Sequence, residues 1–189
     1  MAVITFSRQL GSLGCDIADA VVQRLGYRKA WRGLINQAAR QSRTPEMALE
    51  MLDELGLLGI KPPLSAEKEY LAAIRDLIEE LARDGDILIV GRGGQAILRG
   101  WPGVLHVRVI APLDVRVKRL TDRHGIPEEA ALARIRSSDR RRKRFVERAY
   151  HVNWDDPTLY DLVLNTGALD IATAAGLICL AVTSMVEAK

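Results

Sequence analysis

The segment Ile4-Thr-Phe-Ser-Arg-Gln-Leu-Gly-Ser-Leu-Gly-Cys-Asp-Ile-Ala18 decides how the rest of the chain is interpreted. A short apolar run enters a polar turn with two glycines, and an amphipathic helix is predicted to follow. A strand, a glycine-bearing turn and a helix in this order are typical of a loop that binds phosphate groups. The common form G-x-x-x-x-G-K-[ST] is not satisfied, because Cys15 and Asp16 follow the last glycine in place of a lysine and a hydroxyl residue.

The composition is that of a globular protein with one core. The chain has 189 residues, 48% of them hydrophobic, so we expect a single domain, 1–189, or one core with a small insertion. Charge appears early and the first apolar run is short, so no leader peptide is expected. The most apolar stretch, 171–186, contains threonine, glycine and serine, and a buried terminal helix is favoured over a membrane span. The two cysteines have no metal-type spacing, and the cytoplasm is the expected compartment.

Predicted strands alternate with predicted helices along the chain. Continuous apolar runs at 87–90 and 104–110 are typical of buried parallel strands, and 160–164 is predicted to form a further strand. The alternation predicts an α/β fold, a parallel sheet with helices on both faces. A short edge strand is predicted at 27–31, and helices are predicted at 15–25, 34–39, 45–55, 65–83, 95–98, from 112, from 126 and at the C-terminus.

Ligands of such sheets bind outside the carboxyl ends of the strands. Three polar turns are predicted at this edge, at 7–14, 91–94 and 165–167. They are the first places to look for a site.

In the first turn, Gly11, Ser12 and Gly14 stand just before the predicted helix. Glycines allow successive backbone N–H groups to face one anion, and the helix dipole adds about half a positive charge. Arg8 can partly replace the charge of the absent lysine. A glycine turn before a helix also occurs in many proteins that bind no phosphate, so this turn alone leaves both interpretations open.

In the second turn, Arg92 lies between glycines in the segment Gly91-Arg-Gly-Gly94. Such an arginine can hold a phosphate through two parallel hydrogen bonds, with no neighbouring side chain in the way. The alternative is a solvent-exposed arginine in a tight turn. Its position at the ligand-binding edge of the sheet favours the phosphate site.

Positive charge is concentrated in 134–148, where eight positive and two negative residues give a net charge of +6, against −3 for the rest of the chain. A local anion site fits this distribution better than a surface for nucleic acid. On a helix Asp139 and Arg142 are neighbours, and Arg140 shares its face with two further arginines. Phosphoryl transfer needs positive charge on the migrating group. A solvated basic face and an RNA-binding helix remain open.

The other polar residues have structural explanations. Asp155 and Asp156 can position a metal or a hydroxyl, but the surrounding sequence favours a turn. His106 lies in an apolar strand and is expected to be a hydrogen-bonded core residue, and His124 is expected to end a helix. Cys15 is expected at a helix N-terminus, which lowers a thiol pKa, but no histidine lies nearby in the sequence and no nucleophile is predicted.

With these segments placed, the chain resembles the cytidylate kinase-like family, a branch of the P-loop nucleoside monophosphate kinases. The resemblance extends over most of the chain, from residue 3 to residue 180. It is carried by the segments Ile4-Thr-Phe-Ser-Arg-Gln-Leu-Gly-Ser12, Leu25-Gly-Tyr27, Ile89-Val-Gly-Arg-Gly93, Arg116-Val-Lys-Arg119, Ser138-Asp-Arg-Arg-Arg142, Trp154-x-Asp-Pro157 and Tyr160-Asp-Leu-Val-Leu-Asn-Thr166.

The resemblance implies a kinase of three parts. These are a core at 1–27, 84–125 and 158–189, a helical acceptor-binding insertion at 28–83, and an arginine-rich lid at 126–150. It implies transfer of the γ-phosphoryl group of ATP to CMP or dCMP with Mg²⁺. The expected partners are nucleotide substrates. No membrane and no nucleic acid are expected, and a homodimer is left open.

The site residues fall into three groups. The phosphates of ATP are expected at Arg8, Gly11, Ser12 and Gly14, with Ser12 as the hydroxyl for Mg²⁺. The resemblance assigns the acceptor phosphate to Gly91, Arg92 and Gly93. It assigns the transferring group to Asp139, Arg140 and Arg142.

The chain departs from the family at four positions. Leu13 and Cys15 stand where the family has a glycine and a basic residue, Trp31 replaces an acid, and Gly93 replaces an aspartate. We therefore keep two alternatives to an active kinase of a pyrimidine nucleoside monophosphate. One is a catalytically weak or inactive nucleotide-binding regulatory relative. The other is an RNA-associated protein that uses the basic segment.

Overall fold

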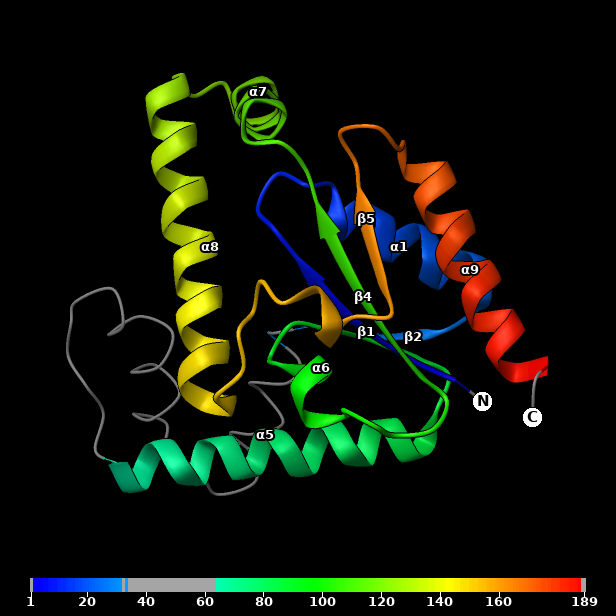
Figure 1. Ribbon diagram of the computed structural model, residues 1–189. Helices are drawn as coiled ribbons and strands as arrows, with labels where there is room; N and C mark the ends of the chain where they lie inside the picture. The colour runs from blue at the N-terminus through cyan, green and yellow to red at the C-terminus, as the bar shows by residue number, and fades with distance from the viewer. Residues whose placement is uncertain (1, 32, 34–63, 188–189) are drawn as a thin grey trace.

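The fold is a parallel β-sheet flanked by helices, seen in a computed structural model that describes residues 2–31, 33 and 64–187 (Figure 1). Within these ranges five parallel strands lie in the order β2-β3-β1-β4-β5. Their bounds are β1 Val3–Arg8, β2 Arg28–Ala30, β3 Ile87–Val90, β4 Val104–Ile110 and β5 Leu162–Asn165. Because β1 lies between β3 and β4, the turn after β1 leaves the middle of the sheet.

The sheet lies between two helical layers (Figure 1), and alternate side chains of its strands are buried under each layer. Four helices form these layers: α1 Gly14–Leu25 and α9 Ile171–Glu187 on one face, α5 Leu64–Asp84 and α6 Gly94–Ile97 on the other. Ile4 and Phe6 belong to the apolar cluster of α1 and α9, whereas Val3 belongs to the cluster of α5. This period of two is that of a strand buried on both faces, and it explains the continuous apolar runs.

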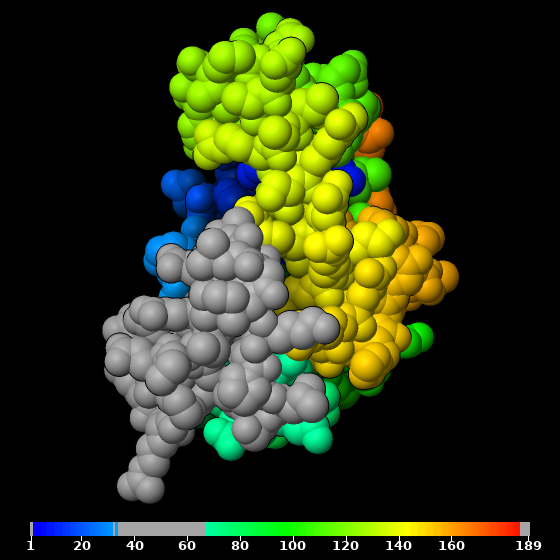
Figure 2. All heavy atoms as spheres, turned by 90° about the vertical axis from the view of Figure 1, so that its left-hand side faces the viewer, coloured from blue at the N-terminus to red at the C-terminus, as the bar shows by residue number. Residues whose placement is uncertain are grey.

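Two further helices, α7 Leu113–His124 and α8 Glu128–Tyr150, lie beyond the carboxyl edge of the sheet. Leu120 of α7 packs with Ala131 and Ile135 of α8 in a third apolar cluster. From there α8 runs to the turn after β3, where the hydroxyl of Tyr150 donates to the carbonyl of Arg92 at 2.9 Å. In Figure 2, α8 forms a ridge down the face of the molecule, and blue atoms of the N-terminal segment are visible beside it.

The segment after α8 returns to the sheet over β1 and β4. The indole Nε1 of Trp154 donates to the hydroxyl of Ser7 at 2.9 Å, and Trp154 is buried. The guanidinium of Arg108 lies 4.2 Å from the centre of the Trp154 ring and donates to the hydroxyl of Tyr160 at 3.2 Å. This packing holds the C-terminal end of α8 against the sheet.

The structure confirms most of the predicted elements and corrects one boundary. The edge strand, the long helix before β3 and the terminal helix are present. The last strand begins at Leu162 and not at Tyr160, because Tyr160 ends a 3₁₀ turn, Pro157–Leu159, and donates its hydroxyl to the carbonyl of Trp154. The predicted helices at 34–39 and 45–55 lie outside the described residues. The division into core, insertion and lid stays a prediction.

Three expectations for polar residues are confirmed. His106 is buried, shares a hydrogen bond with the hydroxyl of Thr5 at 2.7 Å, and has its pKa lowered by burial. His124 is the last residue of α7. Asp156 forms the expected turn by accepting the N–H of Thr158 at 2.9 Å. In the described part of the chain, every helix is too short or too polar to span a membrane.

Gly93 marks a close approach of α8 to the turn after β3. An added Cβ would lie 2.1 Å from Cε2 of Tyr150, and the backbone φ is +73°. Gly100 has a similar φ of +78° with nothing within 4 Å of an added Cβ. We expect Gly93→Ala to lower the free energy of unfolding by about 2 kcal/mol more than Gly100→Ala, because both strain the backbone but only the first displaces Tyr150. Urea denaturation measures both, and equal losses would contradict this packing.

Candidate phosphate-binding site

A carboxylate from α8 holds the loop between β1 and α1. Asp139 accepts the N–H of Leu10 at 2.9 Å and a guanidinium N–H of Arg116 from α7 at 2.6 Å. Arg116 is 7% exposed and also donates to the carbonyls of Ala111 and Leu10. Arg142 donates to the same carboxylate at 3.3 Å. Asp139 thus accepts hydrogen bonds from three donors in three segments, which is the environment of a residue that holds others in position. Its expected role on the transferring group stays a prediction.

The other side of this loop is bonded to the turn after β5. Arg119 of α7 donates to the carbonyl of Thr166 at 2.6 Å and to its hydroxyl at 3.0 Å. The hydroxyl of Thr166 donates to the carbonyl of Ser12 at 2.9 Å. Two of the polar turns predicted at the sheet edge are therefore in direct contact. The sequence marked Arg116 and Arg119 as part of the resemblance but indicated no role for them.

The glycines of the loop make room for protein groups. An added Cβ on Gly11 would lie 2.9 Å from a side-chain atom of α7, and one on Gly14 would lie 2.6 Å from Cβ of Arg8. Leu13 has a φ of +60°, in the left-handed region that costs an ordinary residue energy. The N–H groups of Leu13, Gly14 and Cys15 have no acceptor among the described residues. They stand at the start of α1, where backbone donors and the helix dipole favour an anion.

Arg8 extends from this loop to the turn after β3. Its side chain passes Gly14, and Nη1 lies 2.8 Å from the position that a Cβ on Gly91 would occupy. Its Nε is buried and has no hydrogen-bond partner in the described part of the chain. The carbonyl of Arg8 accepts a hydrogen bond from Arg142 at 3.2 Å. Gly14 and Gly91 thus leave room for the side chain of Arg8. Its buried Nε–H has no acceptor among the described residues, and a buried donor of this kind lowers stability unless a ligand accepts its hydrogen bond.

The second guanidinium at this position belongs to Arg142. Burial, and after it the charge of Arg8, lowers the pKa of Arg142 to about 10, while Asp139 acts in the opposite direction. Arg142 therefore stays charged at neutral pH, close to a like charge. Arg8, Arg116 and Arg142 gather around the loop, and Asp139 is the one carboxylate that the described residues pair with them. The surplus positive charge favours a bound anion.

The turn after β3 is enclosed between α5 and α8. Arg92 is 9% exposed, which excludes the alternative of a solvent-exposed arginine. Its guanidinium lies 5.9 Å from the centre of the Tyr70 ring on α5 and 5.7 Å from that of the Phe145 ring on α8. Gly91 and Gly93 flank it with φ values of +80° and +73°. The assignment of this turn to an acceptor phosphate stays a prediction.

The structure also places Arg140 and Ser12. Arg140 is exposed and stands two residues, about 200° of rotation, from Arg142, so it lies on a different face of α8. Ser12 is 0% exposed and donates its hydroxyl to the carbonyl of Gln9 at 2.9 Å. The roles expected for both residues stay predictions. The described residues contain no group of three or more histidine, cysteine, aspartate or glutamate side chains that can hold a metal.

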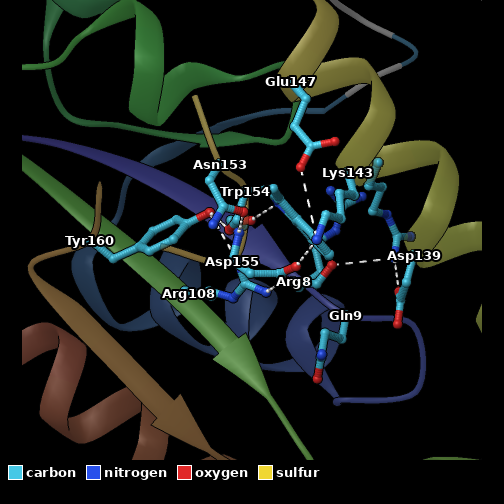
Figure 3. Close-up of polar contacts among 12 residues, drawn as sticks. Arg8, Gln9, Arg108, Asp139, Lys143, Glu147, Asn153, Trp154, Asp155 and Tyr160 are labelled. Atoms are coloured by element: carbon cyan, nitrogen blue, oxygen red, sulfur yellow. Dashed lines mark hydrogen bonds and ion pairs between the residues drawn. The ribbon is translucent and has the colours of Figure 1, made fainter. Parts of the chain in front are cut away.

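A second polar cluster lies beside the loop, between β4, α8 and the segment that follows α8 (Figure 3). Arg108 is 5% exposed and donates to Asp155 at 2.7 Å, and Lys143 of α8 donates to the other oxygen of Asp155 at 2.7 Å. Burial raises the pKa of Asp155, but the hydrogen bonds from Lys143 and Arg108 outweigh it and leave the pKa lowered. No sequence signal pointed to Asp155 as the partner of a strand residue 47 positions away.

Comparison with known proteins assigns the family. A family model described as cytidylate kinase-like matches residues 3–168. The chain belongs to the cytidylate kinase-like family. It is 25% identical over 185 residues to a cytidylate kinase of Methanocaldococcus jannaschii, covering 97% of this chain and 98% of that protein. It is 28% identical over 169 residues to a cytidylate kinase of Pyrococcus horikoshii, covering 87% and 79%.

Other matches are partial or support the fold alone. A uronate isomerase of Corynebacterium glutamicum is 36% identical over 95 residues, but the match spans 50% of this chain and only 18% of that protein. The structure of an uncharacterized protein from Eubacterium ventriosum has a TM-score of 0.78 at 20% identity, covering 97% and 99% of the two chains. A gluconokinase structure from Sinorhizobium meliloti has a TM-score of 0.57 at 16% identity, covering 98% and 94%. These structures therefore share the fold of this chain, a parallel sheet flanked by helices.

Asp139 provides a test of how the loop is held. We expect Asp139→Asn to lower the free energy of unfolding by about 3 kcal/mol, because it leaves the buried Arg116 without its charge partner. Asp16→Asn is the matched control, since it breaks an exposed pair with Arg123 at 3.3 Å and is expected to cost less than about 1 kcal/mol. Urea denaturation without nucleotide measures both. A loss at Asp139 no larger than at Asp16 would show that the pair does not hold the loop.

Proposed function

We propose that this chain transfers the γ-phosphoryl group of ATP to a pyrimidine nucleoside monophosphate, CMP or dCMP. The observation that carries the proposal is the pair Arg8 and Arg142 at the end of β1. Arg8 keeps a buried Nε that has no acceptor within 2–31, 33 and 64–187, and Arg142 stays charged although burial and Arg8 lower its pKa. A phosphoryl group, with several charged oxygens, satisfies both groups. The relatives named cytidylate kinase suggest the reaction.

Phosphoryl transfer requires positioning and charge neutralisation more than covalent chemistry. In this proposal the N–H groups of Leu13, Gly14 and Cys15 bind phosphates of ATP at the start of α1. Arg8 and Arg142 neutralise the oxygens of the group in transfer. Asp139 keeps Arg142 in place and is not a proton acceptor.

The acceptor phosphate is assigned to Arg92 and its neighbours Gly91 and Gly93. Because Nη1 of Arg8 lies against Gly91, one guanidinium stands between the two phosphate positions. This arrangement reduces the repulsion between two anions that must approach each other. The part of the chain that the structure describes holds no cluster of metal-ligating side chains, so no step of this proposal depends on Mg²⁺.

The second candidate is a protein that binds nucleotide with weak or no catalysis. The buried hydroxyl of Ser12 and the presence of Cys15 in place of the usual lysine favour it, because phosphate loops ordinarily offer both a free hydroxyl and a lysine. This protein would bind ATP without turnover. The two candidates share the anion site and differ only in the reaction.

A coupled assay of ADP formation from ATP, Mg²⁺ and CMP tests the proposal. We expect turnover by the wild-type chain and a fall in kcat/KM of about 100-fold or more in Arg8→Met and in Arg142→Met, because each removes a charge from the transferring group. Arg144→Met is the matched control: it removes an exposed arginine from the far side of α8 and is expected to leave the activity unchanged.

Two results would contradict the proposal. Activity that survives in both arginine variants would remove these residues from the site. Absence of turnover with every nucleoside monophosphate would exclude the kinase. If a thermal shift with ATP still shows binding, where a ligand at 100 times its Kd adds about 2.7 kcal/mol, the second candidate holds.

A further inference from the structure

An exposed tryptophan follows strand β2. Trp31 is 59% exposed, whereas Trp154 is 3% exposed. Single exposed apolar side chains are common on proteins and need no explanation by themselves. What distinguishes Trp31 is its position relative to the phosphate-binding site.

The strand register places Trp31 at the ligand-binding edge of the sheet. Ala30 of β2 pairs with Ile89 of β3, so the next residue, Trp31, is level with the last residue of β3 and one position before Gly91. Neighbouring strands lie about 4.8 Å apart. Since the guanidinium of Arg8 lies against Gly91, Trp31 stands about one strand spacing from the turn that Arg8 contacts.

The alternation of side chains places Trp31 on the same face as Arg8. Ala30 is buried in the cluster under α5, and Lys29 pairs with a carboxylate of α1 on the opposite face. Continued by one residue beyond the end of β2, the same alternation places Trp31 on the α1 face. Arg8 leaves β1 on this face too, because Phe6, two residues earlier, packs in the cluster of α1. A guanidinium whose buried Nε has no acceptor among the described residues and an exposed aromatic ring thus share one edge and one face.

We propose that Trp31 stacks on the base of the acceptor nucleotide whose phosphate lies between Arg8 and Arg92. This inference rests on the proposed function and narrows it to acceptors that carry an aromatic ring. A nucleoside monophosphate has a single pentose between its phosphate and its base, and Trp31 and the turn that Arg8 contacts stand at the ends of neighbouring strands. Stacking on an aromatic side chain accepts every base, so Trp31 selects for the presence of a base and not for its identity.

Binding of CMP and of ribose 5-phosphate, measured by calorimetry on wild type, Trp31→Phe and Trp31→Leu, tests this inference. Ribose 5-phosphate carries the sugar and phosphate without the base. We expect Trp31→Leu to weaken CMP binding by about 5- to 100-fold and Trp31→Phe to retain most of it. Binding of ribose 5-phosphate is expected to be the same in all three. Because Trp31 is largely exposed, urea denaturation should show unchanged stability in both variants.

The outcomes separate this inference from the function on which it rests. Equal CMP affinity in wild type and Trp31→Leu overturns the stacking role and leaves the kinase proposal untouched. An equal loss of CMP and ribose 5-phosphate binding also overturns it, because the ring then supports the phosphate site and not the base. A wild-type chain that binds ATP but no nucleoside monophosphate overturns the proposed function itself, and the inference with it.

Discussion

The carboxylate of Asp139 bonds to the loop after β1, to α7 and to α8 at once, and the geometry of the candidate site depends on it. Without this carboxylate, the guanidinium groups of Arg116 and Arg142 would lie close together with no negative charge between them. Its hydrogen bond from the N–H of Leu10 also holds the loop in position at the sheet edge. One interaction therefore joins three segments that are distant in the sequence, and it does so in a place from which water is largely excluded.

The same cluster carries a net positive charge, and this charge bears on the proposed function. One carboxylate neutralises one of the three arginines around the loop, and the structure offers Arg8 no acceptor for its buried Nε among the described residues. In many phosphate loops a lysine at the helix start provides the cation. Here Arg8 comes from the strand end instead, and its side chain passes Gly14 and ends against Gly91. In the proposed function, Arg8 takes the place of the absent lysine.

Helix α8 contacts the rest of the molecule at several levels, and these contacts differ in strength. Near its middle, Lys143 and Asp155 are both partly exposed, so their ion pair contributes little. Closer to its end, Arg148 pairs with Glu67 of α5, and Tyr150 donates to the turn that holds Arg92. A movement of α8 would therefore displace the loop after β1, the turn after β3 and α5 together. This coupling suits a lid, the role that the resemblance implies for this helix.

The sequence by itself determined the parallel sheet, the helices that cover it and the family, because apolar period, glycine positions and local motifs act over a few residues. It also located the polar turns at the sheet edge and the arginine-rich helix. Only the tertiary structure decided which side of that helix meets the loop: Arg142 faces it and Arg140, two residues earlier, does not. It also showed that Asp139 accepts a hydrogen bond from the N–H of Leu10, 129 residues away. The physical reason is that the helical period shows which residues share a face of a helix. Which of these faces is buried depends on the packing of elements that are distant in the sequence.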